Sequence, residues 1–330
     1  MNIQDYQGIL VFAEQREGVI SSVAFELLSK ARELAEQKPM TVTALLMGEG
    51  ITPLASELHA AGADHVILVD DPALGHYLTE PYTHAFHQVI MAKKPEIVML
   101  GATTIGRDLG PRLSARLMTG LTADCTQLDM SPDGHLMMTR PAFGGNLCAT
   151  ILCKEHRPQI STVRPGVMRR AAADPSRTGT TESFAVAFST EAPKVRVKQV
   201  VKAEKHLVDI TEANILVSGG RGVGSHDGFD KLRALADCIK AEVSSSRAMV
   251  DAGLIGHERQ VGQTGKTVRP DVYIACGISG AIQHLAGMEE SEYIIAINKD
   301  KFAPIFGVAD LGLVGDLHQI LPALTKKLSR

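Results

Sequence analysis

The stretch that decides the fold is residues 8–35, GILVFAEQREGVISSVAFELLSKARELA. Its first six residues, Gly8–Ala13, form a short apolar run that predicts a buried strand. From residue 20 onward, apolar side chains recur at i, i+3, i+4 and i+7 spacing, which predicts an amphipathic helix. A strand that leads directly into a helix is the repeating half of a β-α-β unit, the unit from which parallel sheets are built.

The same alternation continues through the first third of the chain. Further strands are predicted at 41–47, 65–70 and 96–100, and helices at 52–61, 80–92 and 108–118. Parallel strands joined by helices cross over right-handed and form a doubly wound sheet. We therefore expect a Rossmann-like α/β domain at the N-terminus.

The pattern changes after residue 118. Short strands are predicted at 136–140, 147–153, 159–163, 182–188 and 194–201. We expect them to form an antiparallel extension of the sheet. Residues 194–205 (KVRVKQVVKAEK) alternate charge and valine, which indicates an edge strand closing the first domain. The domains are then expected to be 1–205 and 206–330.

A second strand-helix series follows in the C-terminal part. Strands are predicted at 214–218, near 243, and at 272–276, 293–298 and 311–314, with helices at 230–240 and 317–328. This series predicts a second, smaller doubly wound domain with a parallel sheet. No repeat of fixed period is visible.

The composition excludes several classes of protein. The 330 residues carry 34 Lys+Arg and 37 Asp+Glu, a formal net charge of −3, with the signs interspersed. Binding to nucleic acid or to an anionic membrane therefore has no evident source. No apolar run approaches the roughly 20 residues of a membrane span. No targeting signal is visible at the N-terminus, so a cytoplasmic location is expected.

The cysteines favour neither disulfides nor a metal site. They are scattered and form no Cys-x-x-Cys pair. The five positions are Cys125, Cys148, Cys153, Cys238 and Cys276. We expect reduced thiols and no metal.

Glycine and polar residues gather directly after the predicted strands of the second domain. Gly219–Gly224 (GGRGVG) is a turn whose backbone amides could approach a phosphate. Its spacing is not that of the Gly-x-Gly-x-x-Gly dinucleotide fingerprint, and a tight turn without a ligand is an equally good interpretation of this turn alone.

Four further polar segments follow later strands. They are SSSR at 244–247, QVGQTGK at 260–266, GISG at 277–280 leading into a helix with Gln283 and His284, and NKD at 298–300 together with Asp316. Ligands of open α/β sheets bind at the carboxyl ends of the strands, so the five loops together predict a nucleotide cofactor site. The chain shows no nucleophile elbow, no P-loop and no acid-base carboxylate pair. We therefore assign no catalytic residue and favour redox chemistry carried by a cofactor.

The motifs resemble one family closely. GGRGVG, SSSR, QVGQTGK, GISGAIQHLAG, AINKD, APIF and VADLGLVGDL resemble the C-terminal FAD-binding domain of the electron transfer flavoprotein alpha subunit. In the first domain, residues 101–126 (GATTIGRDLGPRLSARLMTGLTADCT), 140–146 (RPAFGGN) and 162–168 (TVRPGVM) look like that family's other signatures. The resemblance covers nearly the whole chain.

The resemblance implies bound FAD with its isoalloxazine ring near Arg247, Thr264 and His284. A guanidinium and an imidazole donor would stabilise an anionic semiquinone, and the Thr264 hydroxyl would hydrogen-bond N5. Other loop residues would face the pyrophosphate, the ribityl chain and the adenosine. The complete set of cofactor-binding candidates is Arg221, Ser246, Arg247, Gln260, Gly262, Gln263, Thr264, Gly265, Ser279, Gly280, Ile282, Gln283, His284, Asn298, Lys299 and Asp316.

The resemblance also implies a function and partners. The chain would form a heterodimer with a beta subunit that packs against the first domain. It would shuttle single electrons between a flavin dehydrogenase of the acyl-CoA dehydrogenase type and a downstream acceptor. An alternative is the electron-bifurcating type, which uses NADH through the beta subunit, with ferredoxin or flavodoxin and an acyl-CoA dehydrogenase as acceptors. The beta subunit would hold AMP in the first case and a second FAD in the other.

Two hypotheses about function, from other classes of protein, stay open at this point. One is an NAD-dependent dehydrogenase, against which the irregular glycine spacing counts. The other is a nucleotide-sensing module that uses the same loops to regulate a partner.

Overall fold

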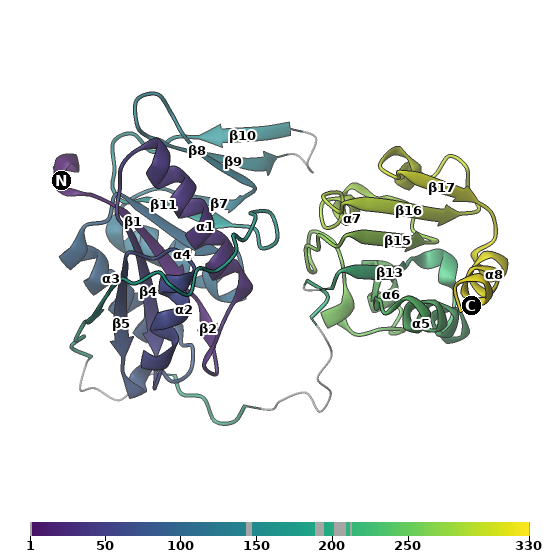
Figure 1. The fold of residues 1–330 in the computed structure, drawn as a ribbon, viewed down its shortest axis with the longest axis horizontal. Coiled ribbons are helices and arrows are strands. Elements are labelled where there is room, and N and C mark those ends of the chain that lie inside the picture. The colour runs from purple at the N-terminus through teal and green to yellow at the C-terminus, as the bar shows by residue number, and fades with distance from the viewer. Residues whose placement is uncertain (1, 143–146, 189–194, 201–208, 212, 330) are drawn as a thin grey trace. The chain divides into compact units, whose positions relative to one another are not determined.

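The computed structural model describes residues 2–142, 147–188, 195–200, 209–211 and 213–329. The chain divides into two compact units, Met1–Val201 and Lys202–Arg330, which are coloured purple to teal and green to yellow in Figure 1. Each unit has its own sheet and its own hydrophobic clusters, so each is described by itself.

The N-terminal unit is built on a seven-stranded sheet in which every neighbouring pair is parallel. In sheet order the strands are β12 (Thr180–Ser183), β5 (His65–Asp70), β4 (Val42–Gly48), β1 (Ile9–Ala13), β6 (Ile97–Gly101), β11 (Gln159–Val163) and β7 (Leu121–Cys125). The helices are α1 (Ser22–Gln37), α2 (Ala55–Ala60), α3 (Thr79–Lys93) and α4 (Thr104–Leu117). The α/β fold expected from the sequence is confirmed.

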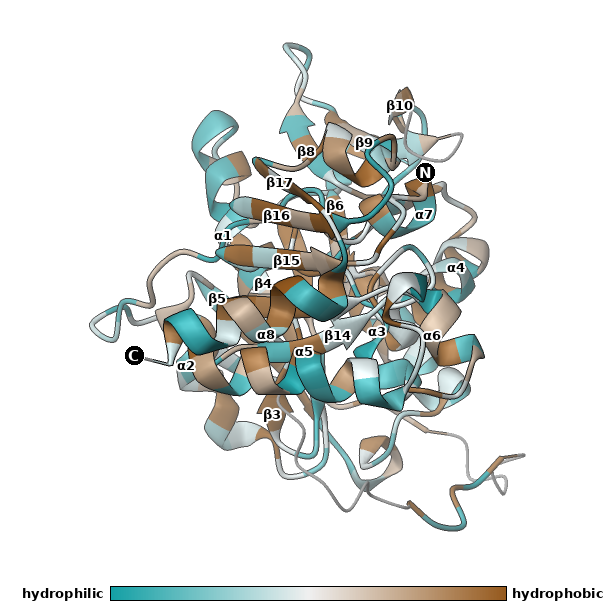
Figure 2. Cartoon of the chain, turned by 90° about the vertical axis from the view of Figure 1, so that its right-hand side faces the viewer, coloured by the Kyte–Doolittle hydropathy of each residue, from teal (hydrophilic) through white to brown (hydrophobic). Residues whose placement is uncertain are grey.

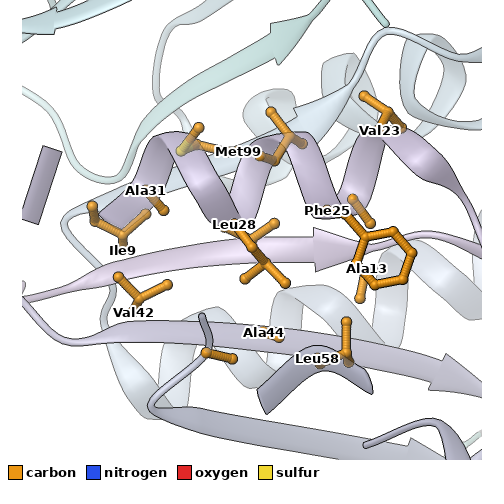
Figure 3. Close-up of a cluster of buried hydrophobic side chains, with 14 of the residues drawn as sticks. Ile9, Ala13, Val23, Phe25, Leu28, Ala31, Val42, Ala44, Leu58 and Met99 are labelled. Carbon is orange, nitrogen blue, oxygen red and sulfur yellow. The ribbon is translucent and has the colours of Figure 1, made fainter. Parts of the chain in front are cut away.

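Strand β1 is buried on both sides, because helices cover both faces of the sheet. Ile9, Val11 and Ala13 belong to the cluster formed with α1, which Figure 3 shows lying across β1 and β4. Leu10 and Phe12 point to the opposite face and join the cluster formed with α3 and α4. A strand covered on both faces has a continuous apolar sequence, which explains why the run GILVFA predicts a buried strand.

The expected antiparallel extension is only partly correct. Strands β8 (Gln127–Met130), β9 (Leu136–Ala142) and β10 (Leu147–Ile151) do form a separate antiparallel sheet. However, β11 was expected in that extension and instead lies between β6 and β7, parallel to both. All five of its residues are buried, as expected of an interior strand, and it lies next to the edge strand β7. A short hairpin, β2 (Gln15–Arg16) with β3 (Val19–Ile20), precedes α1.

Two other predicted strands differ from the structure. The strand predicted at 182–188 is β12, which begins at Thr180, ends at Ser183 and pairs in parallel with β5. Residues 195–200 form no strand, and the rest of the edge strand predicted at 194–201 lies outside the described residues. The expected boundary near residue 206 and residues 143–146 of the RPAFGGN motif also lie outside them.

The C-terminal unit has a five-stranded parallel sheet. In sheet order the strands are β14 (Glu242–Ser245), β13 (Ile215–Gly219), β15 (Val272–Cys276), β16 (Tyr293–Asn298) and β17 (Leu311–Val314). The helices are α5 (His226–Ile239), α6 (Arg247–Asp251), α7 (Ile282–Leu285) and α8 (Leu317–Leu328).

The two faces of this second sheet are covered differently. Helices α5 and α8 pack on the face that carries Val217, Ile274 and Ile297. In Figure 2 both helices alternate brown and teal, as amphipathic helices do, while β15 and β16 are largely brown. The opposite face, which carries Leu216 and Tyr273, is covered mostly by the loops that follow the strands. These loops form the site described below.

Two classes of feature are absent from the described part of the chain. No helix there combines the length and the apolar character that crossing a membrane requires. Within the same residues, no three His, Cys, Asp or Glu side chains gather as a metal site, and the five cysteines are free thiols.

A half-buried ion pair ties the end of β7 to the residue that follows β11. Asp124 Oδ2 lies 2.7 Å from the Arg164 guanidinium, and Arg107 approaches the same carboxylate at 3.7 Å. Burial alone would raise the pKa of Asp124, but the hydrogen bond and charge of Arg164 hold it below its ordinary value. Asp124 therefore stabilises the fold in its ionised form.

We predict that Asp124→Asn lowers the free energy of unfolding by about 1–3 kcal/mol at pH 7. Because the folded pKa is depressed, this contribution is complete above the unfolded value of about 3.9 and is lost as the pH falls below it. Urea titrations at pH 7 and pH 3 test this, with the exposed turn residue changed in Asp133→Asn as the control. A difference from wild type that is equally large at both pH values would contradict the prediction.

Candidate functional site

A cavity of about 1000 Å³ lies at the carboxyl edge of the C-terminal sheet. The loops after all five strands contribute to its lining, together with residues 260–264. A cavity of this size lies at the upper end of the range for small-molecule and cofactor sites, and such sites lie at this edge of open α/β sheets.

Thirteen of the sixteen candidate residues line this one cavity. They are Arg221, Ser246, Arg247, Gln260, Gly262, Gln263, Thr264, Ser279, Gln283, His284, Asn298, Lys299 and Asp316. Gly265, Gly280 and Ile282 do not line it. The two glycines pack tightly against the backbone of Gln260 and Ile305, and Ile282 is exposed.

The glycine-rich turn after β13 is shaped by packing against a neighbouring loop. The Gly222 amide donates to the Gly277 carbonyl at 3.0 Å. A Cβ on Gly222 would lie only 2.8 Å from the Cα of Gly277, so no side chain fits there. The close approach of the two loops explains why position 222 is a glycine. It also places Arg221 at the rim of the cavity.

The QVGQTGK loop is anchored at the sheet edge, where the Val261 amide donates to the Ser245 carbonyl at 2.8 Å. Gly262 has a φ of 135° and lies against the carbonyl of Gln283, a position that excludes a side chain. The buried Gln260 amide nitrogen donates to Thr264 Oγ1 at 3.0 Å. Because Thr264 accepts this bond, its own hydrogen remains available to a ligand in the cavity.

The SSSR segment is split between a strand and a loop. Ser244 and Ser245 belong to β14 and are fully buried, so they do not line the cavity. Only Ser246 and Arg247 reach it. The sequence predicts that all four residues follow the strand and face the sheet edge, because small hydroxyl residues are also common in turns; Ser244 and Ser245 belong to the strand instead.

His284 is buried, and both of its ring nitrogens have partners in the protein. Nδ1 lies 3.1 Å from the Val261 carbonyl oxygen and Nε2 lies 3.0 Å from the Tyr273 hydroxyl. A carbonyl can only accept, so Nδ1 carries the hydrogen of the neutral ring and Nε2 accepts from Tyr273. Burial lowers the pKa of His284 to about 4, which keeps the ring neutral. For the imidazole to donate to a ligand, as expected from the sequence, this arrangement would have to change.

The cationic groups of the site are far less constrained. Arg221, Arg247 and Lys299 are all exposed. Arg247 has 67% of its side chain accessible, and its described ion pair is with Asp251 at 3.3 Å, one turn along α6. Exposed pairs of this kind hold a side chain weakly, so the guanidinium can reorient toward an anion in the cavity.

Two of the candidates for adenosine binding also have structural roles. Asn298 donates to the Ile278 carbonyl at 2.8 Å and accepts from the Asp300 amide, which links the end of β16 to the loop after β15. Asp316 caps α8 by accepting from the His318 amide at 2.9 Å. Carboxylate and amide oxygens have further lone pairs, so both residues can still bind a ligand while they hold these loops.

Two polar residues, one behind the cavity and one in its lining, were not singled out from the sequence. Tyr273, the partner of His284, is a polar residue in a strand that is otherwise apolar, and that contrast was the available signal. His318 lines the cavity, and its buried Nδ1 has no hydrogen-bond partner in the described residues. Nothing in its local sequence distinguishes it from an ordinary residue in the first turn of a helix.

The neutral state of His284 predicts a specific pH dependence. The unfolded chain takes up a proton near pH 6.5 and the folded chain only near pH 4, so stability falls by about 3 kcal/mol as the pH drops through this window. Urea titrations of wild type and His284→Gln between pH 7 and pH 4.5 should show a smaller loss in the variant. The exposed His257 provides the control, since His257→Gln should follow wild type. Parallel curves for His284→Gln and wild type would contradict the prediction.

Comparison with known families agrees with this geometry. The model of the electron transfer flavoprotein domain matches residues 9–189, and that of the electron transfer flavoprotein FAD-binding domain matches residues 209–289. The second match contains the loops at 219–224, 244–247, 260–266 and 277–284.

Relatives that match this chain over nearly its whole length belong to the same family. An electron transfer flavoprotein subunit alpha of Thermoanaerobacterium thermosaccharolyticum is 52% identical, with 99% of each chain covered. One from Clostridium acetobutylicum is 50% identical, over 98% of this chain and 97% of the relative. The subunit LctC of a lactate dehydrogenase (NAD(+),ferredoxin) of Acetobacterium woodii is 44% identical, over 97% of this chain and 76% of its own length. The chain belongs to the electron transfer flavoprotein family as an alpha subunit, which binds FAD and transfers electrons.

Proposed function

We propose that the cavity of the C-terminal unit is the FAD site and that the chain passes single electrons from a flavin dehydrogenase of the acyl-CoA dehydrogenase type to a downstream acceptor. The observation that carries this proposal is the convergence of thirteen candidate residues on one cavity within the unit that the FAD-binding family model matches. FAD supplies an isoalloxazine ring that takes up and releases electrons, and the protein supplies position and charge.

The residues of the cavity fit such a cofactor. Arg221 and Ser246 follow the ends of β13 and β14 and would face the pyrophosphate. The exposed Arg221 guanidinium offers it a charge-assisted hydrogen bond. The free hydrogen of Thr264 can be donated to a ring nitrogen, and Arg247 offers positive charge to the isoalloxazine. Asn298, Lys299 and Asp316 lie on the loops after β16 and β17 and would bind the adenosine.

We further propose a heterodimer with an electron transfer flavoprotein beta subunit. A relative from Anaerotignum propionicum, 45% identical over 98% of this chain, is named acryloyl-CoA reductase electron transfer subunit beta, so a chain of this kind serves as one subunit of a reductase there. A cytoplasmic location is part of the proposal, and cell fractionation tests it.

An electron-bifurcating role is the second candidate. It is favoured by the Acetobacterium woodii relative, whose name couples NAD(+) with ferredoxin. In that role the beta subunit would hold a second FAD, NADH would be the donor, and ferredoxin or flavodoxin would accept one electron of each pair.

Counting the bound nucleotides separates these two functions. We would purify the chain together with its beta subunit, record the visible spectrum, release the flavin and assay FAD and AMP per heterodimer. One FAD with one AMP supports the single-electron carrier, and two FAD without AMP support bifurcation. A colourless complex that takes up no added FAD would overturn both.

We predict that Arg247→Ala lowers the equilibrium constant for one-electron reduction of bound FAD about tenfold, because a cation near the isoalloxazine stabilises the added negative charge. FAD affinity should change less, since the other contacts remain. Spectroscopic redox titration measures the first quantity and flavin release the second.

The matched control is Arg233→Ala. Arg233 is also exposed and also pairs with a carboxylate one turn away, but it lies on α5 and does not line the cavity. An unchanged redox titration in Arg247→Ala, or an equal change in Arg233→Ala, would refute the assignment of Arg247.

A further inference from the structure

Tyr273 lies directly behind the cavity, on the face of the sheet that the loops cover. It is fully buried in β15, and its hydroxyl lies 3.0 Å from Nε2 of His284. The two rings are tilted by 57°, with centroids 6.2 Å apart. Tyr273 does not line the cavity, so it cannot contact a ligand directly, whereas His284 does line it.

The imidazole is therefore held at both nitrogens. Nδ1 donates to the Val261 carbonyl and Nε2 accepts from Tyr273, and these two bonds lie on opposite sides of the ring. A ring held in this way cannot turn without breaking at least one buried hydrogen bond. Leaving a buried polar group unpaired is costly, so the orientation of His284 is strongly favoured.

Two buried serines accompany the tyrosine. Ser218 and Ser244 pair in register on β13 and β14 and share the face of the sheet that carries Tyr273. Their hydroxyls have no hydrogen-bond partner within the described residues. Burial raises the pKa of Tyr273, and the two serines, although outside hydrogen-bond geometry, act in the opposite sense. Neither serine hydrogen-bonds Tyr273, so the hydrogen bond that the geometry supports for the phenolic hydroxyl is the one to His284.

We propose that Tyr273 is a positioning residue for the electron transfer reaction, which acts through His284 on the charge that the bound cofactor can carry. The proposal rests on the proposed function of the cavity. Because Tyr273 lies behind the cavity and donates to Nε2, the positive end of its O–H dipole points toward the cavity, where it would favour negative charge on a bound isoalloxazine. Without the phenolic hydroxyl this dipole is lost and the Nε2 lone pair is left unpaired in the core behind the cavity, so one-electron reduction would be less favourable.

The hydrogen bond itself can be tested without any cofactor. In the full-length chain with 15N-labelled histidine, the His284 ring should show a protonated Nδ1 and a hydrogen-bonded, unprotonated Nε2 at pH 7. Loss of the signals in His284→Gln identifies them. Tyr273→Phe should shift the Nε2 signal toward that of a free acceptor, whereas Tyr293→Phe, at a partly exposed site on the neighbouring strand, should not. A protonated Nε2 in wild type, or an unshifted signal in Tyr273→Phe, would overturn the proposal whatever the cofactor does.

The effect on the cofactor is tested by a double-mutant cycle. Tyr273→Phe should lower the equilibrium constant for one-electron reduction of bound FAD about tenfold and change FAD affinity less than threefold. In a His284→Leu background the same substitution should have no further effect. An equal effect in both backgrounds, or no effect in either, would overturn the proposal. Failure of the wild-type chain to bind FAD would instead overturn the proposed function and leave the NMR result standing.

Discussion

The parallel pairing of β13 with β14 on one side and β15 on the other is the constraint on which the site depends. Gly219, the last residue of β13, is in register with Ser245 and with Cys276, so all three strands end at the same level. The register continues from Cys276 to Ile297 and from Asn298 to Val314. Five loops that are distant in sequence therefore leave the sheet along one edge, and backbone hydrogen bonds fix their relative height. A one-residue slip in any strand would turn its core residues to the opposite face, so the apolar clusters protect this register.

The same register places polar groups inside the unit. Ser218, Ser244 and Tyr273 lie on a face that is otherwise apolar, and the Tyr273 hydroxyl contacts His284 among the loops that cover this face. Buried polar groups are stabilising only when they are paired, so a Tyr-His pair at this point constrains the loops above it. Through Val261 and His284, the QVGQTGK segment is joined to helix α7, which follows GISG, and to the sheet. The shape of the cavity is in this way a property of the core as well as of the loops.

Most of the fold could be predicted from the sequence, because strands such as β1 and β15 are apolar runs and helices such as α1 have a clear 3.6-residue period. The placement of β11 could not, because the order of strands in a sheet is decided by long-range pairing and leaves no local signal. The convergence of the candidate loops was predictable from topology alone, since strand ends of a parallel sheet share an edge. The details of the site were not: Ser244 and Ser245 resemble a loop in sequence, and the importance of Tyr273 appears only when its hydroxyl is seen against His284.

The site combines a rigid neutral group with a mobile charged one. His284 is buried, neutral and held at both nitrogens, whereas Arg247 is exposed and held only by a solvent-accessible ion pair. Charge interactions weaken in proportion to the effective dielectric constant, so the guanidinium would act weakly on a cofactor in the cavity while water surrounds it. Any surface that excludes water from the rim of the cavity would strengthen the effect of Arg247 and leave that of His284 nearly unchanged. In the proposed function, the fixed imidazole would therefore set a baseline for the charge that the cofactor can carry, and the arginine would be the group through which a docked partner alters it.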